Sequence, residues 1–491
     1  MGNGANEPLL AAKKKVYYEK CPGCRQEQKN DSHAGVPYLE FFYIWIVCLC
    51  STLPIQSLFP YLYFMIRDLN VAEREEDIGY YAGFVGAAYM FGRTLTAVLW
   101  GVVADKYGRK PVIVISILSV IIFNTLFGLS TTYWMAIATR ALLGFLCGLL
   151  GPIKAYASEV CRKEHQALGL SLVTSSRAIA LVVGPAIGGF LAQPATKYPN
   201  IFSENSIFGR FPYFLPSFAI SVIAIAAFVA CFWLPETLHM HHDVEDGSVE
   251  SLEASLSGSD SDVNAKATEE SEVTSKRSLF TNWPLMASIT VYCIFSLHDT
   301  AYAEIFSLWA VSAKKYGGLS FSSQDVGMVL SISGFGVLVF QLLFYPPVVK
   351  RLGYITPFRA AAVLSIALLA TYPFMTNLSG FMLQLAVNSA SLLKNVFAAT
   401  IMTACNILQN IAVPQEQRGA ANGISVTAMS IFKAIAPAGG GAIFSWAQKH
   451  QDLPLLPGDQ MIFFILILVE AVGLILSFKP FLRVPSSMTR S

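Results

Sequence analysis

Charged residues are scarce in this chain. Aspartate, glutamate, lysine and arginine together make up 13% of the 491 residues, where a soluble globular domain has roughly 25%. Hydrophobic residues reach 54% and are gathered in long blocks. Because a membrane-spanning helix needs ~20 mostly apolar residues, this composition excludes an ordinary soluble protein and predicts one that crosses the lipid bilayer many times.

Other absences narrow the function. A net charge of +2 is too small to indicate nucleic-acid binding. The sequence contains no nucleophile–base pair and no nucleotide-binding loop, so we do not expect an enzyme. It also lacks the short apolar core of a cleavable signal peptide. The first apolar run begins near Leu39 and is too long for such a core, so it predicts a retained first helix.

Apolar runs separated by charged breaks predict twelve transmembrane helices, and hence an all-α membrane protein. Their approximate limits are 39–65, 79–103, 111–129, 134–157, 168–192, 212–234, 285–311, 325–348, 356–375, 380–411, 420–446 and 460–479. The runs form two groups of six with a polar stretch between them. Each group is expected to form one six-helix half of the molecule.

The polar stretches divide the chain into five parts. The predicted parts are an N-terminal segment 1–38, a first half 39–234, a linker 235–283, a second half 284–480 and a tail 481–491. The linker is rich in serine and acidic residues and poor in large apolar ones, which predicts disorder. Lysine and arginine are concentrated on one side of the predicted helices, so both termini and the linker are expected in the cytoplasm.

The two halves resemble each other. The stretch "WGVVADKYGRKP" follows the second predicted helix, and "YPPVVKRLGYITP" follows the eighth, about 245 residues later. Repeated halves are typical of transporters that bind their substrate between the halves, near the middle of the membrane. Transport would then proceed by rocking of one half against the other.

The loop that begins "GVVADKYGRK" resembles the signature loop of the major facilitator superfamily, and this resemblance implies that fold. Glycine permits a tight turn or a close helix contact, and Asp105 is expected to cap a neighbouring helix. Arg109 is expected to pair with Glu159 and form a latch that holds the outward-facing state. The predicted latch residues are Gly101, Asp105, Gly108, Arg109, Lys110 and Glu159.

The fifth predicted helix ends in "VVGPAIGGF", which resembles the antiporter motif of drug:proton antiporters in the same superfamily. Its glycines and proline are expected to bend the helix and pack it tightly between the halves. The alternative is a packing kink with no bearing on exchange. The motif residues are Gly184, Pro185, Gly188 and Gly189.

A few charged residues fall inside the predicted helices. Four of them, Arg140, Arg177, Lys394 and Lys433, would give a central cavity a positive charge. A buried charge in a membrane helix is a functional hypothesis by default. We therefore predict that these four side chains bind the substrate, and that the substrate carries carboxylates.

One predicted helix, the seventh, carries a cluster of protonatable groups, His298, Asp299 and Glu304. Asp299 and Glu304 are five positions apart, roughly 140° around a helix, so they cannot face one point. Because burial shifts protonation, these residues are the predicted proton-coupling groups, with Asp299 favoured and His298 as its modulator. The alternative is that they pair with the basic residues for structure only.

Cysteine and histidine form two short motifs near the membrane. Cys21 and Cys24 stand in "CPGC", and "HMHH" contains His239, His241 and His242. Both motifs are predicted on the cytoplasmic side, where two cysteines and two histidines would complete a tetrahedral zinc site. Two unrelated patches, or a redox dithiol, remain alternatives. Transport itself requires no cofactor, so a zinc ion there would be regulatory and would gate the carrier.

The motifs "CPGC", "PETLHMHH" and "LHDTAYAEIFSLWA", together with the signature loop, resemble the plant zinc-induced facilitator and facilitator-like transporters. This resemblance implies a proton-coupled antiporter that acts in zinc and iron homeostasis. It would move a small carboxylate-bearing metabolite, a metal chelator of the nicotianamine or phytosiderophore type, out of the cytosol. The alternatives are a potassium/proton exchanger that influences auxin transport, and a cytoplasmic metal sensor with vestigial transport.

The expected partners are therefore the lipid bilayer, a small-molecule substrate and protons, and the carrier is expected to work as a monomer. The stretch "EPLL" at positions 7–10 is similar to an acidic dileucine signal. It favours the vacuolar membrane, with the plasma membrane as the alternative.

Overall fold

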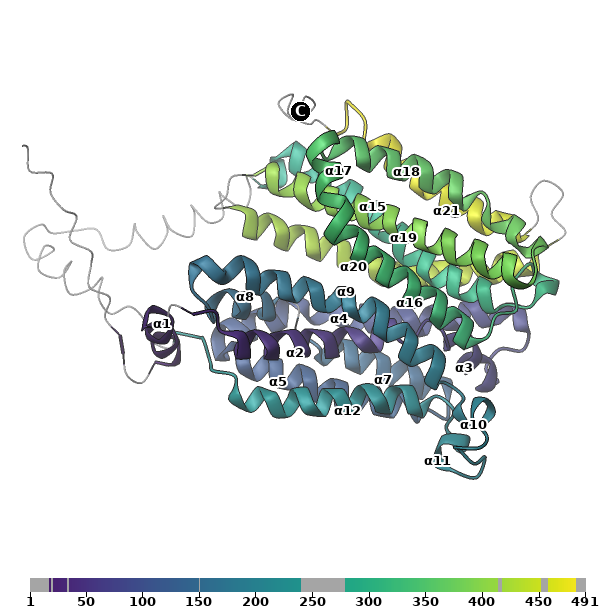
Figure 1. Cartoon of the computed structure of the whole chain (residues 1–491), viewed down its shortest axis with the longest axis horizontal. Helices are drawn as coiled ribbons and strands as arrows, with labels where there is room; N and C mark the ends of the chain where they lie inside the picture. Colours follow the sequence, from purple (N-terminus) through teal and green to yellow (C-terminus); the bar gives the residue numbers. More distant parts are fainter. Residues whose placement is uncertain are drawn as a thin grey trace, which may run out of the picture.

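The computed structural model describes residues 17–18, 21–32, 35–149, 151–239, 279–413, 417–451 and 458–482. Figure 1 shows two bundles of long helices lying side by side, the first half from purple to teal and the second from green to yellow. Most of the predicted linker and tail, together with His241 and His242, lies outside the described residues.

The first half is built from long helices joined by short turns. Its helices are α1 (Pro22–Ser32), α2 (Tyr38–Gln56), α3 (Leu62–Asp68), α4 (Ile78–Tyr107), α5 (Arg109–Ser119), α6 (Thr125–Gly128), α7 (Tyr133–Leu146), α8 (Pro152–Glu159), α9 (Gln166–Leu191), α10 (Pro194–Lys197), α11 (Ile207–Arg210) and α12 (Phe214–Ala230). A π-helical turn at Val120–Asn124 joins α5 to α6.

The second half repeats this plan. Its helices are α15 (Trp283–Val311), α16 (Ser323–Val339), α17 (Tyr345–Leu352), α18 (Ile355–Leu369), α19 (Gly380–Ile411), α20 (Arg418–Lys449) and α21 (Gly458–Leu476). A π-helical turn at Phe340–Phe344 joins α16 to α17.

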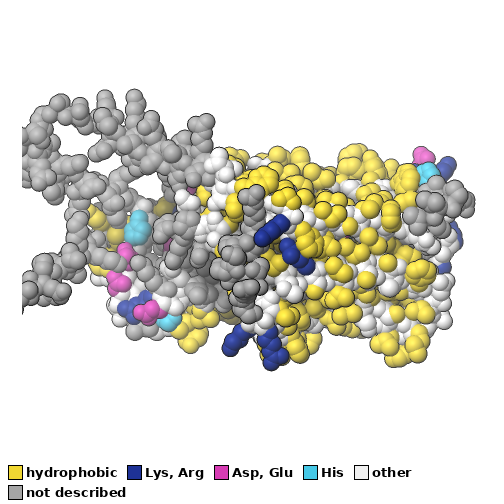
Figure 2. Space-filling model, turned by 90° about the horizontal axis from the view of Figure 1, so that it is seen from above, with side chains coloured by type: hydrophobic (Ala, Val, Ile, Leu, Met, Phe, Trp, Pro, Cys, Tyr) yellow, Lys and Arg dark blue, Asp and Glu magenta, His cyan; other side chains and the backbone are white. Residues whose placement is uncertain are grey.

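In the described part of the chain, nine helical runs are long and apolar enough to cross a membrane. The pair α7–α8, helix α15 and helix α21 supply the remaining spans, so the predicted twelve-helix, all-α fold is confirmed. The tenth predicted span coincides with α19. Figure 2 shows a broad band of hydrophobic side chains on one face, with lysine and arginine gathered toward its two margins, as a lipid-facing surface requires.

Two predicted helices are each broken in two. The first ends at Gln56 and resumes at Leu62, and Pro60 in the break cannot donate a helical hydrogen bond. The fourth ends at Leu146 and resumes at Pro152. A Cβ at Gly148 would lie 2.1 Å from the Trp100 ring. That glycine therefore lets the break pack against α4.

The halves meet through two helix pairs, α4 with α20 and α9 with α16. Glycines make both contacts close. A Cβ on Gly83 would lie 2.4 Å from the Pro437 carbonyl oxygen, and one on Gly189 would lie 2.8 Å from the Gly327 Cα. These contacts lie toward the end of the bundles opposite α1, which we call the outer end, and the end that carries α1 we call the inner end.

Polar contacts also join the halves at the outer end. Lys315 lies 2.8 Å from Glu75, and Lys449 lies 2.5 Å from Asp77. Lys197 of the first half donates to the Ser323 hydroxyl of the second at 2.8 Å. The structure is therefore a conformation in which the outer ends of the halves are held together.

Candidate functional site

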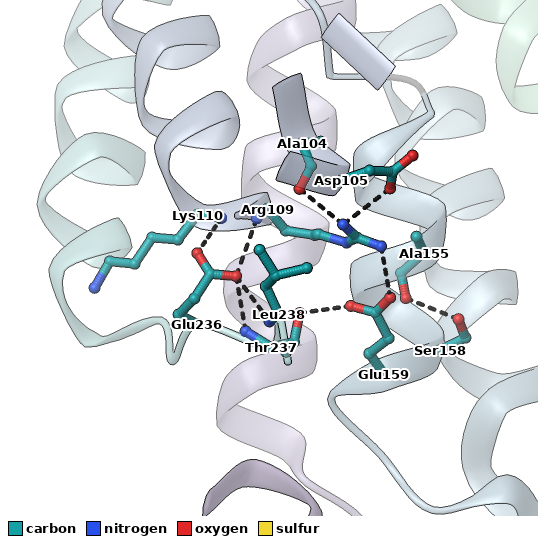
Figure 3. Close-up of polar contacts among 10 residues, drawn as sticks. All are labelled: Ala104, Asp105, Arg109, Lys110, Ala155, Ser158, Glu159, Glu236, Thr237 and Leu238. Carbon is teal, nitrogen blue, oxygen red and sulfur yellow. Dashed lines mark hydrogen bonds and ion pairs between the residues drawn. The ribbon is translucent and has the colours of Figure 1, made fainter. Parts of the chain in front are cut away.

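The signature loop forms a compact network at the inner end of the first half (Figure 3). Arg109 begins α5, and its guanidinium lies 2.9 Å from Asp105 and 3.1 Å from Glu159. The same group donates to the Ala104 carbonyl at 2.7 Å. The predicted pairing of Arg109 with Glu159 is thus present, and it ties α4 and α5 to α8.

The helix cap in this network comes from a residue that the sequence did not single out. Glu236, which follows α12, accepts hydrogen bonds from the backbone N–H groups of Arg109 and Lys110, both at 3.0 Å (Figure 3). An acid at a helix N-terminus satisfies otherwise unpaired N–H groups. The prediction that Asp105 caps a neighbouring helix is therefore wrong, because Asp105 pairs with Arg109 within the same turn.

The two loop glycines have different roles. Gly108 has a φ of +113°, and a Cβ there would lie 2.4 Å from the Glu236 carboxylate, so the predicted tight turn is confirmed. A Cβ on Gly101 would meet nothing within 4 Å. The close helix approach expected at Gly101 is absent in this conformation.

The latch contacts coexist with a closed outer end. They therefore do not require the outward-facing state, contrary to the sequence prediction. All of them lie within the first half and the segment that follows it. A network inside one half can survive rocking of the halves and act by shaping the inner end.

The glycine-rich motif of α9 packs where the sequence predicted. A Cβ on Gly184 would lie 2.5 Å from Gln56, and one on Gly188 would lie 1.9 Å from the Ser57 carbonyl oxygen. Gly189 faces α16 of the other half, and a Cβ on Gly327 would lie 2.6 Å from the Pro185 carbonyl oxygen. The motif thus packs α9 against α2 on one side and against the second half on the other.

The four basic residues predicted to bind substrate do not form a single group. Arg140 is 2% exposed, donates to the Pro54 carbonyl oxygen at 2.9 Å and lies over the rings of Tyr89 and Phe127. Close packing at Gly144 contributes to this enclosure, since a Cβ there would lie 2.0 Å from the Tyr89 carbonyl oxygen. In this conformation Arg140 faces an aromatic box and not an open cavity.

A second group of basic residues comes from both halves. Lys433 of α20 lies close enough to Arg177 of α9, Arg93 of α4 and Asp299 of α15 to interact with each. Lys154 of α8 interacts with Arg177 and Arg93 in the same way. Arg93 and Lys154 were not among the predicted binding residues, although their position inside apolar runs was the available signal.

Lys394 belongs to a third group, inside the second half. It is 1% exposed and lies over the Tyr302 ring, and it lines a narrow cavity with His298, Asp299 and Glu470. His298 and Glu470 approach to 3.4 Å. The cavity is too narrow for a water molecule in this conformation, so it has no room for a substrate.

Glu470 was not predicted as a site residue. It accepts a hydrogen bond from Ser365 at 2.8 Å, which links α21 to α18 beside the α15 cluster. A single acid near the middle of the last predicted span was the sequence signal for it.

Glu304 lies apart from Asp299, as their spacing predicted. It is 2% exposed, and its carboxylate oxygens have no hydrogen-bond partner among the described residues. A Cβ on Gly86 of α4 would lie 3.2 Å from one of these oxygens. Glu304 therefore faces the contact between the halves, where an unpaired ionised carboxylate is costly.

Cysteine and histidine side chains converge at the inner end. The donor atoms of Cys21, Cys24 and His239 all lie within 4.8 Å of one another. His241 and His242, the other histidines of the predicted site, lie outside the described residues. Three of the five predicted metal-ligating residues are thus brought together from segments more than 200 positions apart.

Comparison with known proteins agrees with this geometry. A sequence model of the Major Facilitator Superfamily matches residues 44–437. The crystal structure of a D-xylose–proton symporter superimposes with a TM-score of 0.66 at 13% identity, covering 92% of this chain and 98% of that one. Fold and sequence together define a membrane transporter of the Major Facilitator Superfamily, and not an enzyme.

Relatives narrow the family. A probable peptide/nitrate transporter of Arabidopsis thaliana is 57% identical and covers 94% of this chain and 96% of its own length. Zinc induced facilitator-like 1 of the same plant is 54% identical, with coverages of 95% and 97%. Zinc induced facilitator 1 is 52% identical, with coverages of 98% and 99%. Within the superfamily, the chain belongs to the zinc-induced facilitator family.

Proposed function

We propose that the protein is a proton-coupled antiporter that moves a small carboxylate-bearing metal chelator out of the cytosol in zinc and iron homeostasis. The observation that carries this proposal is the basic group of Arg93, Lys154, Arg177 and Lys433, which draws side chains from both halves. A substrate that bridges the two halves near mid-membrane is what alternating access requires.

The charge of this group favours an anionic substrate. Asp299 is the acid that interacts with Lys433, so basic side chains dominate the group. A free zinc or potassium ion would need oxygen or thiolate ligands and would be repelled here. A chelator of the nicotianamine type brings several carboxylates. Zinc in the names of two relatives supports a role in zinc homeostasis.

Proton coupling is assigned to Asp299, His298 and Glu304. Asp299 lines the cavity with His298 and Lys394 and lies within electrostatic range of Lys433 in the basic group. Nicotianamine-type chelators also carry amines, and an ionised Asp299 would attract a protonated amine. Protonation of Asp299 would remove this attraction, so the proton and the substrate would compete for the site. Such competition is the basis of antiport.

The test is transport by the purified protein in vesicles with an imposed pH gradient. The panel contains labelled nicotianamine, a phytosiderophore, a dipeptide, nitrate, auxin and potassium, each assayed in both membrane orientations. We expect chelator movement that requires the pH gradient and does not respond to potassium. Movement of potassium with no chelator would instead establish the potassium/proton exchanger, and no transport of any substrate would favour a metal sensor.

Variants locate the substrate group. Loss of a charged hydrogen bond costs about 1.5–3 kcal/mol, so Arg177→Gln is expected to raise the KM for the chelator roughly 10- to 150-fold. Arg67→Gln is the matched control, because Arg67 lies in α3 at the outer end and contacts Asp68. An unchanged KM in Arg177→Gln would remove Arg177 from the site.

A further inference from the structure

The cluster of Cys21, Cys24 and His239 has the dimensions of a metal site. The sulfurs of Cys21 and Cys24 lie 3.9 and 3.7 Å from Nδ1 of His239. Tetrahedral zinc with Zn–S of about 2.3 Å and Zn–N of about 2.0 Å holds sulfur and nitrogen about 3.5 Å apart. Both sulfur–nitrogen distances are therefore within a few tenths of an ångström of those in a zinc site.

Backbone contacts hold the cysteine segment at the start of α1 against the segment that carries His239. The N–H of Gly23 donates to the Leu238 carbonyl oxygen at 3.1 Å, and the N–H of Arg25 donates to the Cys21 carbonyl oxygen at 3.1 Å. A Cβ on Gly23 would lie 2.8 Å from both the ring and the backbone nitrogen of His239. Glycine at this position is thus what lets the histidine reach the cysteines, so the arrangement is built into the fold.

Helix α1 is anchored beside the signature-loop network. Gln26 donates to the Val160 carbonyl at 3.1 Å, and Asn30 donates to the Glu159 carbonyl at 3.2 Å. Both cysteine side chains are buried, while His239 is exposed. Solvent can therefore supply a fourth ligand on the histidine side.

A histidine nitrogen beside both sulfurs favours metal binding over a redox dithiol. Thiolate and imidazole together are the ligands that zinc prefers over calcium or magnesium.

We propose that Cys21, Cys24 and His239 bind a regulatory Zn²⁺ ion that locks the signature loop. The segment that carries His239 also holds that loop. Glu236 caps α5 through the N–H groups of Arg109 and Lys110, and Thr237 donates to Glu159 at 2.6 Å. Zinc that holds His239 against α1 would therefore also hold Glu236 and Thr237, which bind the loop. The proposal does not depend on the identity of the substrate.

Binding is tested on the purified full-length protein by zinc titration against a coloured competitor, and by cobalt substitution. We expect one tight site with a thiolate-to-cobalt absorption band. Loss of an outer hydrogen-bond partner of a ligand already costs about 10- to 100-fold in affinity, so Cys21→Ser, Cys24→Ser and His239→Ala should each lose more than about 100-fold.

The matched controls are Cys161→Ser and His450→Ala. Cys161 is a buried cysteine at the same end that donates to the Ala157 carbonyl, and His450 stacks on Trp446 at the outer end. Both should bind zinc as the wild type does. Thermal unfolding without zinc verifies that each variant is folded. Equal zinc affinity in the wild type and the folded Cys21→Ser/Cys24→Ser variant would overturn the site.

The lock is tested by amide hydrogen exchange, independently of transport. Zinc should slow exchange at the N–H groups of Arg109 and Lys110 in the wild type and leave it unchanged in His239→Ala. If zinc binds tightly but exchange in this loop does not change in the wild type, the coupling to the signature loop is refuted.

Discussion

Gly108 shows how one residue can determine the geometry of a site. Its positive φ lets the chain turn from α4 into α5, and the absence of a Cβ leaves room for the Glu236 carboxylate. Glu236 in turn satisfies two N–H groups at the start of α5. A single glycine thus allows a helix cap, an arginine network and the segment that carries His239 to meet in one place.

Replacement of this glycine gives the first prediction. Gly108→Ala should destabilise the protein by about 1–3 kcal/mol, because it combines an unfavourable φ with a clash against Glu236. Gly101→Ala is the control: Gly101 lies inside α4 with open space around it, and alanine favours a helix by up to about 1 kcal/mol. Thermal unfolding in detergent measures both. Equal loss of stability in the two variants would contradict the assignment.

Glu304 carries the second prediction at this scale. Glutamine has the shape of a protonated glutamate, so Glu304→Gln should fold at least as stably as the wild type, because its carboxylate lacks a hydrogen-bond partner among the described residues. If Glu304 exchanges a proton during the cycle, the variant should lose its response to a pH gradient but retain substrate binding. Transport with and without the gradient tests this, and a wild-type response would remove Glu304 from the coupling.

At the scale of elements, short helices outside the membrane hold the long ones. Helix α10 has four residues, and its last residue, Lys197, donates to the Gly189 carbonyl of α9 and to Ser323 of α16. It therefore joins the end of the glycine-rich motif to the opposite half. Burial lowers the pKa of Lys197 to about 8, against a smaller opposing attraction from Asp325.

The third prediction follows from this pKa: association of the outer ends of the two halves should depend on pH. An exposed lysine titrates near 10.4, so the closed form holds its proton less tightly than an open form would. Below pH 8 the proton penalises closure, and the penalty fades as pH rises from about 8 to about 10. The closed fraction should therefore increase as pH rises from about 8 to about 10. Lys197→Met should abolish this increase.

Fluorescent amino acids at Ile201 and Phe374 would report this closure. Both side chains are exposed and they belong to different halves. Lys350→Met, at the inner end, is the matched control. Persistence of the trend in Lys197→Met would assign it to the other lysine pairs at the outer end, Lys315 with Glu75 and Lys449 with Asp77.

At the scale of the whole molecule, the halves touch through glycine. Gly79 and Gly83 of α4 pack on Gly441 of α20, and Gly189 packs on Gly327. Backbones that approach this closely gain van der Waals contact without interlocking side chains. Such surfaces can separate and rejoin without repacking, as a rocking mechanism needs.

The fourth prediction follows from these contacts. Gly83→Val should hold the outer ends apart, because even a Cβ there would lie 2.4 Å from the Pro437 carbonyl oxygen. We expect a longer distance between the fluorescent positions and a transport rate at least about tenfold lower, or ~1.4 kcal/mol. Gly439→Val is the control, since a Cβ there meets nothing within 4 Å. Equal rates in the two variants would show that this contact does not limit the cycle.

Much of the fold could be predicted from sequence because a membrane helix is determined by its own contiguous residues. In lipid each span must satisfy its own backbone hydrogen bonds, so a long apolar run is enough to identify it. The breaks after Gln56 and after Leu146 were missed, since hydropathy continues through them. Pairing of Arg109 with Glu159 was predictable because opposite charges lay on neighbouring inner ends.

The sequence by itself determined the twelve helices, the positive loop and the ligand types in "CPGC" and "HMHH", because composition and spacing act locally. Only the tertiary structure decided which distant residues meet. Glu236, and not Asp105, caps α5, and Glu470 joins His298. His239 reaches two cysteines more than 200 positions away. These contacts depend on how α1 packs on α8 and where α12 ends, and local sequence patterns do not determine either.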